Sequence, residues 1–400
     1  MALITSTYAI LMLLTLLAIT VSSAPICNGN SDCSDKPSLV TNYPGQWPSS
    51  YCKVRNVIFS TGDQVLRIDG DLSDLDACHQ TKNIWKFESA KSDQHHQSLN
   101  NIVCDQVFSR GHFFTPYYYH GSNYFHLHYD TLLPLFVALH QDSTKSSSGA
   151  IKDIALLPGI ETTRGEGIDW NTDAFNDLRS YWMQLLTALS KPHRLLPLDR
   201  RLAGINKTVC FEEAYFGTPK IDFSSPELLQ SYALFVKKAF GIKSPKTNVD
   251  SKKPKIGLIH REGRRKILNE AELVKSMSAV AKVDVVDFSF MSVKEQIEKV
   301  QQYNVLIGMN GAGLVNALYL PKSSVAVQLV PYKAQLNVAE FASLLRSRGS
   351  YIEWHNNHPE LDRRIPEDVF RNGADTIVDV GEFVQIASRA LQINRDNLRS

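Results

Sequence analysis

The stretch NVLIGMNGAGLVNALYLPKSSVAVQLV, residues 304–330, reads as a strand, a glycine turn, a helix and a second strand. Residues 305–309 form an apolar run of strand length, and residues 314–320 suit a short helix that Pro321 ends. The β-branched run 325–330 follows as the next strand. The stretch therefore predicts one βαβ unit of a parallel sheet.

The turn inside this unit is small enough for a ligand to approach its backbone. Gly311, Ala312 and Gly313 would offer backbone N–H groups at the start of a helix, where the dipole favours phosphate. A tightly packed turn without a ligand explains a lone GxG pattern equally well. The neighbouring sequence has to decide between the two interpretations.

Strands and helices alternate before this unit. We expect a strand at 255–260, a helix at 269–279, a strand at 283–288 and a helix at 293–303, which predicts a parallel sheet with its ligand at the carboxyl edge. The first strand leads into a basic turn that contains Arg261 and Arg265. Planar guanidinium groups suit a diphosphate, although a solvated basic turn is the commoner fate of such a charge run.

A dense polar and aromatic cluster fills residues 111–136. If Ser122 caps a helix that begins near Asn123, His126 and Asp130 stand four residues apart on one face. Neutral His126 could then accept a proton from a hydroxyl with Asp130 orienting it, or Asp130 could itself be the base. The alternative is a histidine and aspartate pair that only satisfies itself. No spacing of histidines and carboxylates predicts a metal site.

The length of 400 residues favours two domains, and the net charge of +2 gives no reason to expect nucleic acid as a partner. Residues 242–253 have the composition of a linker. We predict a leader at 1–24, a first domain with a disulfide-stapled cap at 25–241, this linker, and a nucleotide-binding domain at 254–400.

The first 31 residues carry no charged side chain, and residues 8–21 are almost continuously apolar. Entry into the secretory pathway follows, through a cleaved signal peptide or a short signal-anchor. Six cysteines in such a compartment suggest structural disulfides, with the pairing left open, and Asn206 begins a glycosylation acceptor. We expect a lumenal protein of the endoplasmic reticulum or Golgi, secreted or anchored as a type II membrane protein.

Three motifs resemble those of glycosyltransferase family 61. IGMNGAGLVNALYLPKSSVAVQLVPY is similar to the donor-site signature with its HGAGL core, and REGRRKILNEAEL resembles the arginine-rich motif. NYFHLHYDTLLPLF resembles the N-terminal motif Asn-x-x-His followed by Asp-x-Leu-x-Pro-Leu. All three occur in the family's order.

This resemblance implies a GT-B fold, in which two Rossmann-like α/β domains face each other across a cleft. It also implies an inverting transferase that needs no metal or other cofactor. His126 or Asp130 would be the base toward the acceptor. The UDP of the donor sugar would be held by Arg261, Arg265, Asn310, Gly311, Ala312, Gly313 and Gln328.

The donor stays open within the family. ILNEAEL looks like the animal branch that adds N-acetylglucosamine to O-linked mannose on glycoproteins, whereas Gln328 is similar to the plant pentosyltransferases that use UDP-xylose. Asn310 stands where the family has the histidine of HGAGL, and asparagine carries neither a positive charge nor a titratable proton. A catalytically impaired protein that binds glycan or nucleotide is therefore a third alternative.

Overall fold

A computed structural model describes most of the chain. The described residues are 40–44, 50–78, 85–89, 102–114, 123–141, 154–158, 160–161, 168–169, 181–191, 193–195, 207–243, 253–335, 337–363 and 374–399. The predicted leader, Ser122, Asn206 and most of the predicted linker lie outside them. No helix in the described part is long and apolar enough to cross a membrane.

The first half of the chain builds a mixed sheet with the path β4-β3-β2-β10-β5-β6-β9, and β1 also pairs with β2. β10 lies antiparallel to β2 but parallel to β5, so segments far apart in sequence meet at the centre of the sheet. β2, from the N-terminal part of the first predicted domain, lies at this centre. The strands are β1 Val40–Pro44, β2 Ser50–Ser60, β3 Val65–Ile68, β4 Phe87–Ser89, β5 Gln106–Phe114, β6 Ile154–Pro158, β9 Arg194–Leu195 and β10 Thr208–Phe216.

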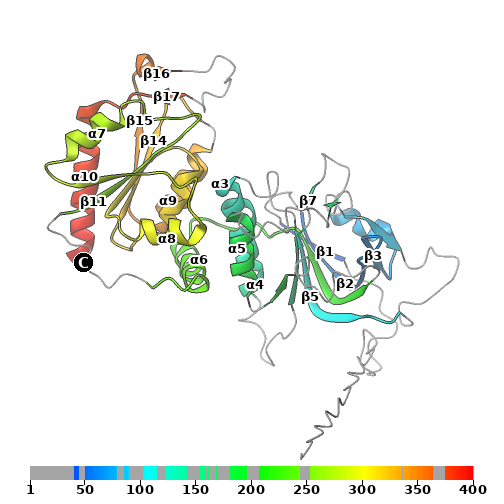
Figure 1. Ribbon diagram of the computed structural model, residues 1–400. Helices are drawn as coiled ribbons and strands as arrows, with labels where there is room; N and C mark the ends of the chain where they lie inside the picture. Colours follow the sequence, from blue (N-terminus) through cyan, green and yellow to red (C-terminus); the bar gives the residue numbers. More distant parts are fainter. Residues whose placement is uncertain are drawn as a thin grey trace, which may run out of the picture.

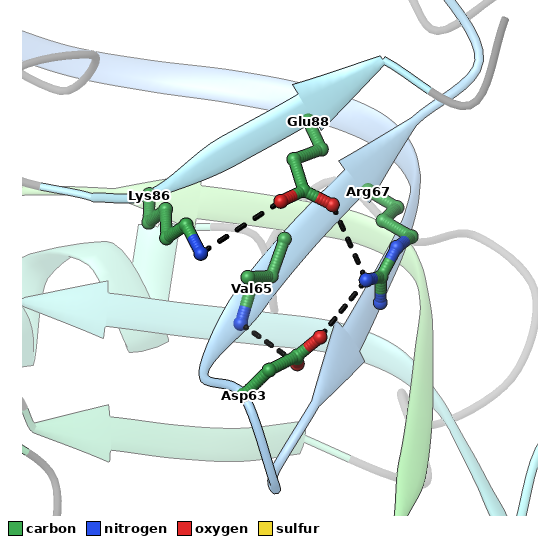
Figure 2. A network of polar contacts seen from close by, with 5 residues as sticks. All are labelled: Asp63, Val65, Arg67, Lys86 and Glu88. Carbon is green, nitrogen blue, oxygen red and sulfur yellow. Dashed lines mark hydrogen bonds and ion pairs between the residues drawn. The ribbon is translucent and has the colours of Figure 1, made fainter. Parts of the chain in front are cut away.

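Cross-links hold this sheet together at two places. Cys104 and Cys210 form a disulfide, and Cys52 is also disulfide-bonded. At one edge of the sheet, Arg67 bridges Asp63 at 2.9 Å and Glu88 of the neighbouring strand at 3.2 Å (Figure 2). The prediction of structural disulfides is thus confirmed for these cysteines.

The second half of the chain builds a five-stranded sheet in the order β12-β11-β13-β14-β15, and every pair in it is parallel. The three central strands β11, β13 and β14 are almost completely buried and mostly apolar, as expected of a parallel sheet that is covered on both faces. The predicted α/β class with a parallel sheet is confirmed. The strands are β11 Lys255–Ile259, β12 Lys282–Val286, β13 Val305–Met309, β14 Val325–Val330 and β15 Tyr351–His355.

Helices cover the two faces of this sheet (Figure 1). α7 Glu270–Met277 and α10 Val380–Arg399 supply the apolar residues of one face. α8 Val293–Val300, η7 Ala312–Tyr319 and α9 Val338–Arg348 supply those of the other. η7 is a 3-10 helix that starts directly after Gly311, so the helix predicted at 314–320 begins earlier and is wound more tightly.

A group of helices from the first half of the chain packs against this second face. α6, which precedes the predicted linker, contacts both α9 and η7, and it also contacts α5. One continuous apolar cluster therefore includes residues from both halves of the chain. The helices in this group are α3 Tyr124–His126, the π-helix η3 Leu127–Leu132, α4 Leu133–Gln141, α5 Tyr181–Ser190 and α6 Pro226–Ala239.

Candidate functional site

The predicted basic turn and the predicted glycine turn meet at one edge of the parallel sheet. They follow β11 and β13, which are neighbouring strands although β12 lies between them in sequence. This is the point where the strand order reverses, and open α/β sheets bind ligands there, beyond the carboxyl ends of the strands. The topology thus selects this edge independently of any motif.

Both predicted arginines reach the glycine turn. Nη1 of Arg265 donates to the carbonyl of Asn310 at 2.7 Å. The guanidinium of Arg261 lies against Gly311, since a Cβ at that glycine would stand 2.3 Å from Nη1 of the arginine. A side chain at this position would therefore displace the guanidinium of Arg261.

Local contacts and backbone conformation position the two arginines at this edge. Nε of Arg261 donates to the carbonyl of Arg264 at 3.3 Å. Burial, and then the charge of Arg264, lower the pKa of Arg261, which still stays protonated near neutral pH. Arg265 has a left-handed backbone with φ of 58°, which a β-carbon disfavours and which turns its side chain toward the neighbouring strand end. Partly desolvated positive charge at the edge of a sheet suits a phosphate group.

His260 adds a further group that the sequence analysis did not select. Its Nε2 contacts Glu262 at 3.0 Å and its Nδ1 contacts Glu270 at 2.8 Å. The hydrogen bond to Glu262, followed by that to Glu270, raises the pKa of His260. The sequence could have indicated this residue, because it directly follows the strand β11 and has glutamates two and ten residues later.

Asn310 and Gln328 lie beneath the turn. Both side chains are completely buried, and Oδ1 of Asn310 accepts from Nε2 of Gln328 at 3.2 Å. Oε1 of Gln328 in turn accepts from the hydroxyl of Tyr351 at 2.7 Å. The two amides therefore support the strand ends from inside, and their contact with a donor stays a prediction.

A second buried network supports η7. Nδ2 of Asn316 donates to Oε1 of Gln296 at 2.9 Å and to the carbonyl of Gly313 at 3.2 Å. Nε2 of Gln296 donates to the carbonyls of Phe288 and Met291 in the loop after β12. The glycine turn is therefore held in place by the next loop along the sheet edge.

The predicted acid–base pair forms at the start of α3. Oδ1 of Asn123 caps this helix, one residue after the predicted cap, by accepting from the backbone N–H of Phe125 at 3.0 Å and of His126 at 3.4 Å. Nδ1 of His126 lies 2.7 Å from Oδ2 of Asp130, and both side chains are about one-seventh exposed. The prediction that they share a face is confirmed. A π-helix follows, and such segments are frequent at functional sites.

The pair lies on elements that pack against η7, the helix that follows the glycine turn. α3 contacts η7, and the ring of Phe125 stacks on Phe341 of α9 with centroids 4.1 Å apart. Tyr129, beside Asp130, stacks on Phe223 at 4.0 Å. The structure thus brings the N-terminal motif next to the helix that begins at Gly311. Within the described ranges, no three metal-ligating side chains lie close enough to hold an ion.

Comparison with known proteins identifies the class. The model of the Glycosyltransferase 61 family matches residues 124–327, which span His126 and Asp130, the basic turn and the glycine turn. The chain belongs to this family.

Three similar proteins are each described as protein O-linked-mannose beta-1,4-N-acetylglucosaminyltransferase 2. The human protein is 26% identical over 282 residues and the Bos taurus protein 27% identical over 287, each match covering 67% of this chain and 46% of the relative. The Takifugu rubripes protein is 24% identical over 343 residues, or 68% of this chain and 54% of the relative. The chain thus spans about half the length of these relatives.

Proposed function

We propose that this chain is an inverting glycosyltransferase that moves N-acetylglucosamine from UDP-N-acetylglucosamine to a glycan on a glycoprotein. The observation that carries the proposal is that the His126 and Asp130 pair lies on elements packed against η7, the helix that follows the arginine-lined glycine turn. The first site would activate an acceptor hydroxyl, and the second would hold the departing UDP.

An inverting transfer requires few catalytic groups. One in-line attack on the anomeric carbon needs a base on the acceptor side and positive charge near the leaving diphosphate. Either His126 or Asp130 would take the proton of the acceptor hydroxyl. Arg261, Arg265 and the amides near Gly311 would stabilise the diphosphate as the bond to the sugar breaks, so we propose a reaction without a metal ion.

The two sheets suit the GT-B arrangement, with the donor on the parallel sheet and the acceptor toward the first sheet. We propose this arrangement because the N-terminal motif lies beside the donor-side helix. The apolar leader and the disulfides support a lumenal address in the endoplasmic reticulum or Golgi. The names of the similar proteins support N-acetylglucosamine and a mannosylated glycoprotein as partners.

Two other functions have a specific residue in their favour. Gln328 favours a pentosyl donor such as UDP-xylose, because the plant pentosyltransferases of the family share this residue. Asn310 favours a protein that binds nucleotide or glycan without turnover, since it replaces the family's histidine.

A donor screen separates the three functions. Release of UDP is followed from UDP-N-acetylglucosamine, UDP-xylose, UDP-N-acetylgalactosamine and UDP-glucose, with and without a mannosyl peptide. Acceptor-dependent release from the first donor is the expected result, and release from UDP-xylose alone would assign the pentosyl function. Calorimetric binding of UDP without release from any donor would contradict the transferase proposal.

A further inference from the structure

One buried hydrogen bond joins the acceptor-side motif directly to the donor-side helix. Nε2 of His128 lies 2.9 Å from the hydroxyl of Tyr319, and the two residues are 191 positions apart in sequence. Both side chains are completely buried. A polar contact of this kind is costly to break, because loss of the hydroxyl of Tyr319 would leave Nε2 of His128 buried without its hydrogen-bond partner.

The geometry determines the direction of this bond. Nδ1 of His128 lies 2.8 Å from the carbonyl of Tyr124, and a carbonyl can only accept. Nδ1 therefore carries the ring proton, which leaves Nε2 as an acceptor for the hydroxyl of Tyr319. Burial lowers the pKa of His128 to about 4, so the ring is neutral near pH 7 and keeps this role.

The positions of His128 and Tyr319 in their helices show which segments the hydrogen bond connects. His128 lies within the π-helix between His126 and Asp130. Tyr319 is the last residue of η7, the helix that starts next to Gly311. The bond therefore connects the segment that carries the acid–base pair to the segment that begins at the donor turn.

Aromatic packing restricts the ring of His128. The ring of Tyr124 lies 4.4 Å from that of His128, and Tyr232 of α6 meets the same ring edge-on at 6.0 Å. Such close packing restricts the rotamer of the His128 ring. The hydrogen bond thus fixes how far η3 can shift along the axis of η7.

We propose that His128 and Tyr319 are positioning residues, which hold the acid–base pair of the acceptor side in register with the donor turn. This proposal rests on the proposed transferase function. Neither residue needs to touch a substrate. A misplacement of about 1 Å between reacting groups can cost about 100-fold in rate, so a lost bond at this junction should appear mainly in kcat.

The test uses Tyr319→Phe, which removes only the hydroxyl, with His128→Leu and the double variant beside it. Tyr303→Phe is the matched control. The ring of Tyr303 is also buried, and the substitution also removes one hydroxyl, which donates to Asp284 at 2.8 Å. Tyr303 lies just before β13, away from the contact between His128 and Tyr319. For each protein we measure kcat and KM for donor and acceptor, UDP affinity by calorimetry, and Tm.

Tyr319→Phe should lower kcat by about 10- to 100-fold while UDP affinity and both KM values change less than about twofold. The double variant should regain Tm relative to Tyr319→Phe, because it leaves no buried unpaired nitrogen, yet keep the low kcat. Tyr303→Phe should lose Tm without loss of kcat.

Two results would overturn the proposal with the transferase function intact: a kcat for Tyr319→Phe like that of the unmodified protein, or a kcat that recovers with Tm in the double variant. An unmodified protein without transfer from any donor would overturn both proposals together.

Discussion

Substitution of Gly311 by alanine tests how the two turns work together. The new Cβ would lie 2.3 Å from Nη1 and 3.0 Å from Cζ of Arg261, so the guanidinium has to move. The backbone of Gly311 is extended, with φ of 168°, and alanine adopts this conformation without strain. The clash therefore falls on the far end of one flexible side chain.

The magnitude follows from what the arginine loses. A hydrogen bond to a charged group contributes about 1.5 to 3 kcal/mol, so a displaced Arg261 should weaken UDP binding by about 10- to 150-fold. Stability should change little, because the arginine can swing outward and alanine reduces the freedom of the unfolded chain. We expect a Tm within a few degrees of that of the unmodified protein.

Calorimetric titration with UDP, beside a thermal melt, measures both effects. Arg264→Ala is the control for charge, since it removes a neighbouring exposed arginine that does not contact Gly311. It should change UDP affinity by less than about threefold.

A double variant shows whether Gly311→Ala weakens UDP binding by displacing Arg261 or by contacting the ligand directly. If the methyl group acts by moving Arg261, adding Gly311→Ala to Arg261→Ala should weaken binding no further. Additive losses would refute this reasoning and would mean that the methyl group meets the ligand directly. Unchanged affinity in Gly311→Ala would refute the phosphate assignment of the arginine.

Three other changes give separate tests. Asp130→Asn should lower transfer at least about 100-fold with UDP affinity near normal, and full transfer would exclude the carboxylate from the mechanism. Arg265→Ala should weaken UDP binding about tenfold, since it removes a charge and the bond to Asn310, and equal affinity by calorimetry would contradict this. His112→Phe should raise Tm at pH 7, because neither ring nitrogen of this buried histidine has a hydrogen-bond partner among the described residues. Burial, and then Arg110 and His193, lower its pKa to about 3, so the unfolded chain takes up the proton first and stability falls below about pH 6.5. Between pH 7 and 5, the free energy of unfolding measured in urea should fall by about 2 kcal/mol less in His112→Phe than in the unmodified protein. An unchanged pH dependence would contradict the lowered pKa of His112.

Much of the parallel sheet could be predicted because its signals are local. Residues 305–309 and 325–330 are apolar runs between glycine, proline and serine, and both strands have the predicted bounds. The contact between His126 and Asp130 was also predictable, since four residues of spacing are enough to bring the two side chains together in either an α-helix or a π-helix.

Features that depend on distant partners could not be predicted. The π-helix at η3 and the 3-10 winding of η7 lie where the two halves of the chain meet, and local propensity does not predict them. The bond from His128 to Tyr319 needs two elements 191 residues apart to meet. The pairing of Cys104 with Cys210 likewise follows from β5 lying beside β10.

The burial of Asn310 changes what its departure from the family motif implies. In a surface turn, replacing a histidine by asparagine would remove a cation from the phosphate site. Here the side chain bonds to Gln328 below the turn, while Arg261 and Arg265 reach the turn itself. Donor binding should therefore survive the replacement, because the charges that would hold the diphosphate come from another strand end. Any effect of Asn310 should act through the shape of the turn, and so should appear in kcat before it appears in UDP affinity.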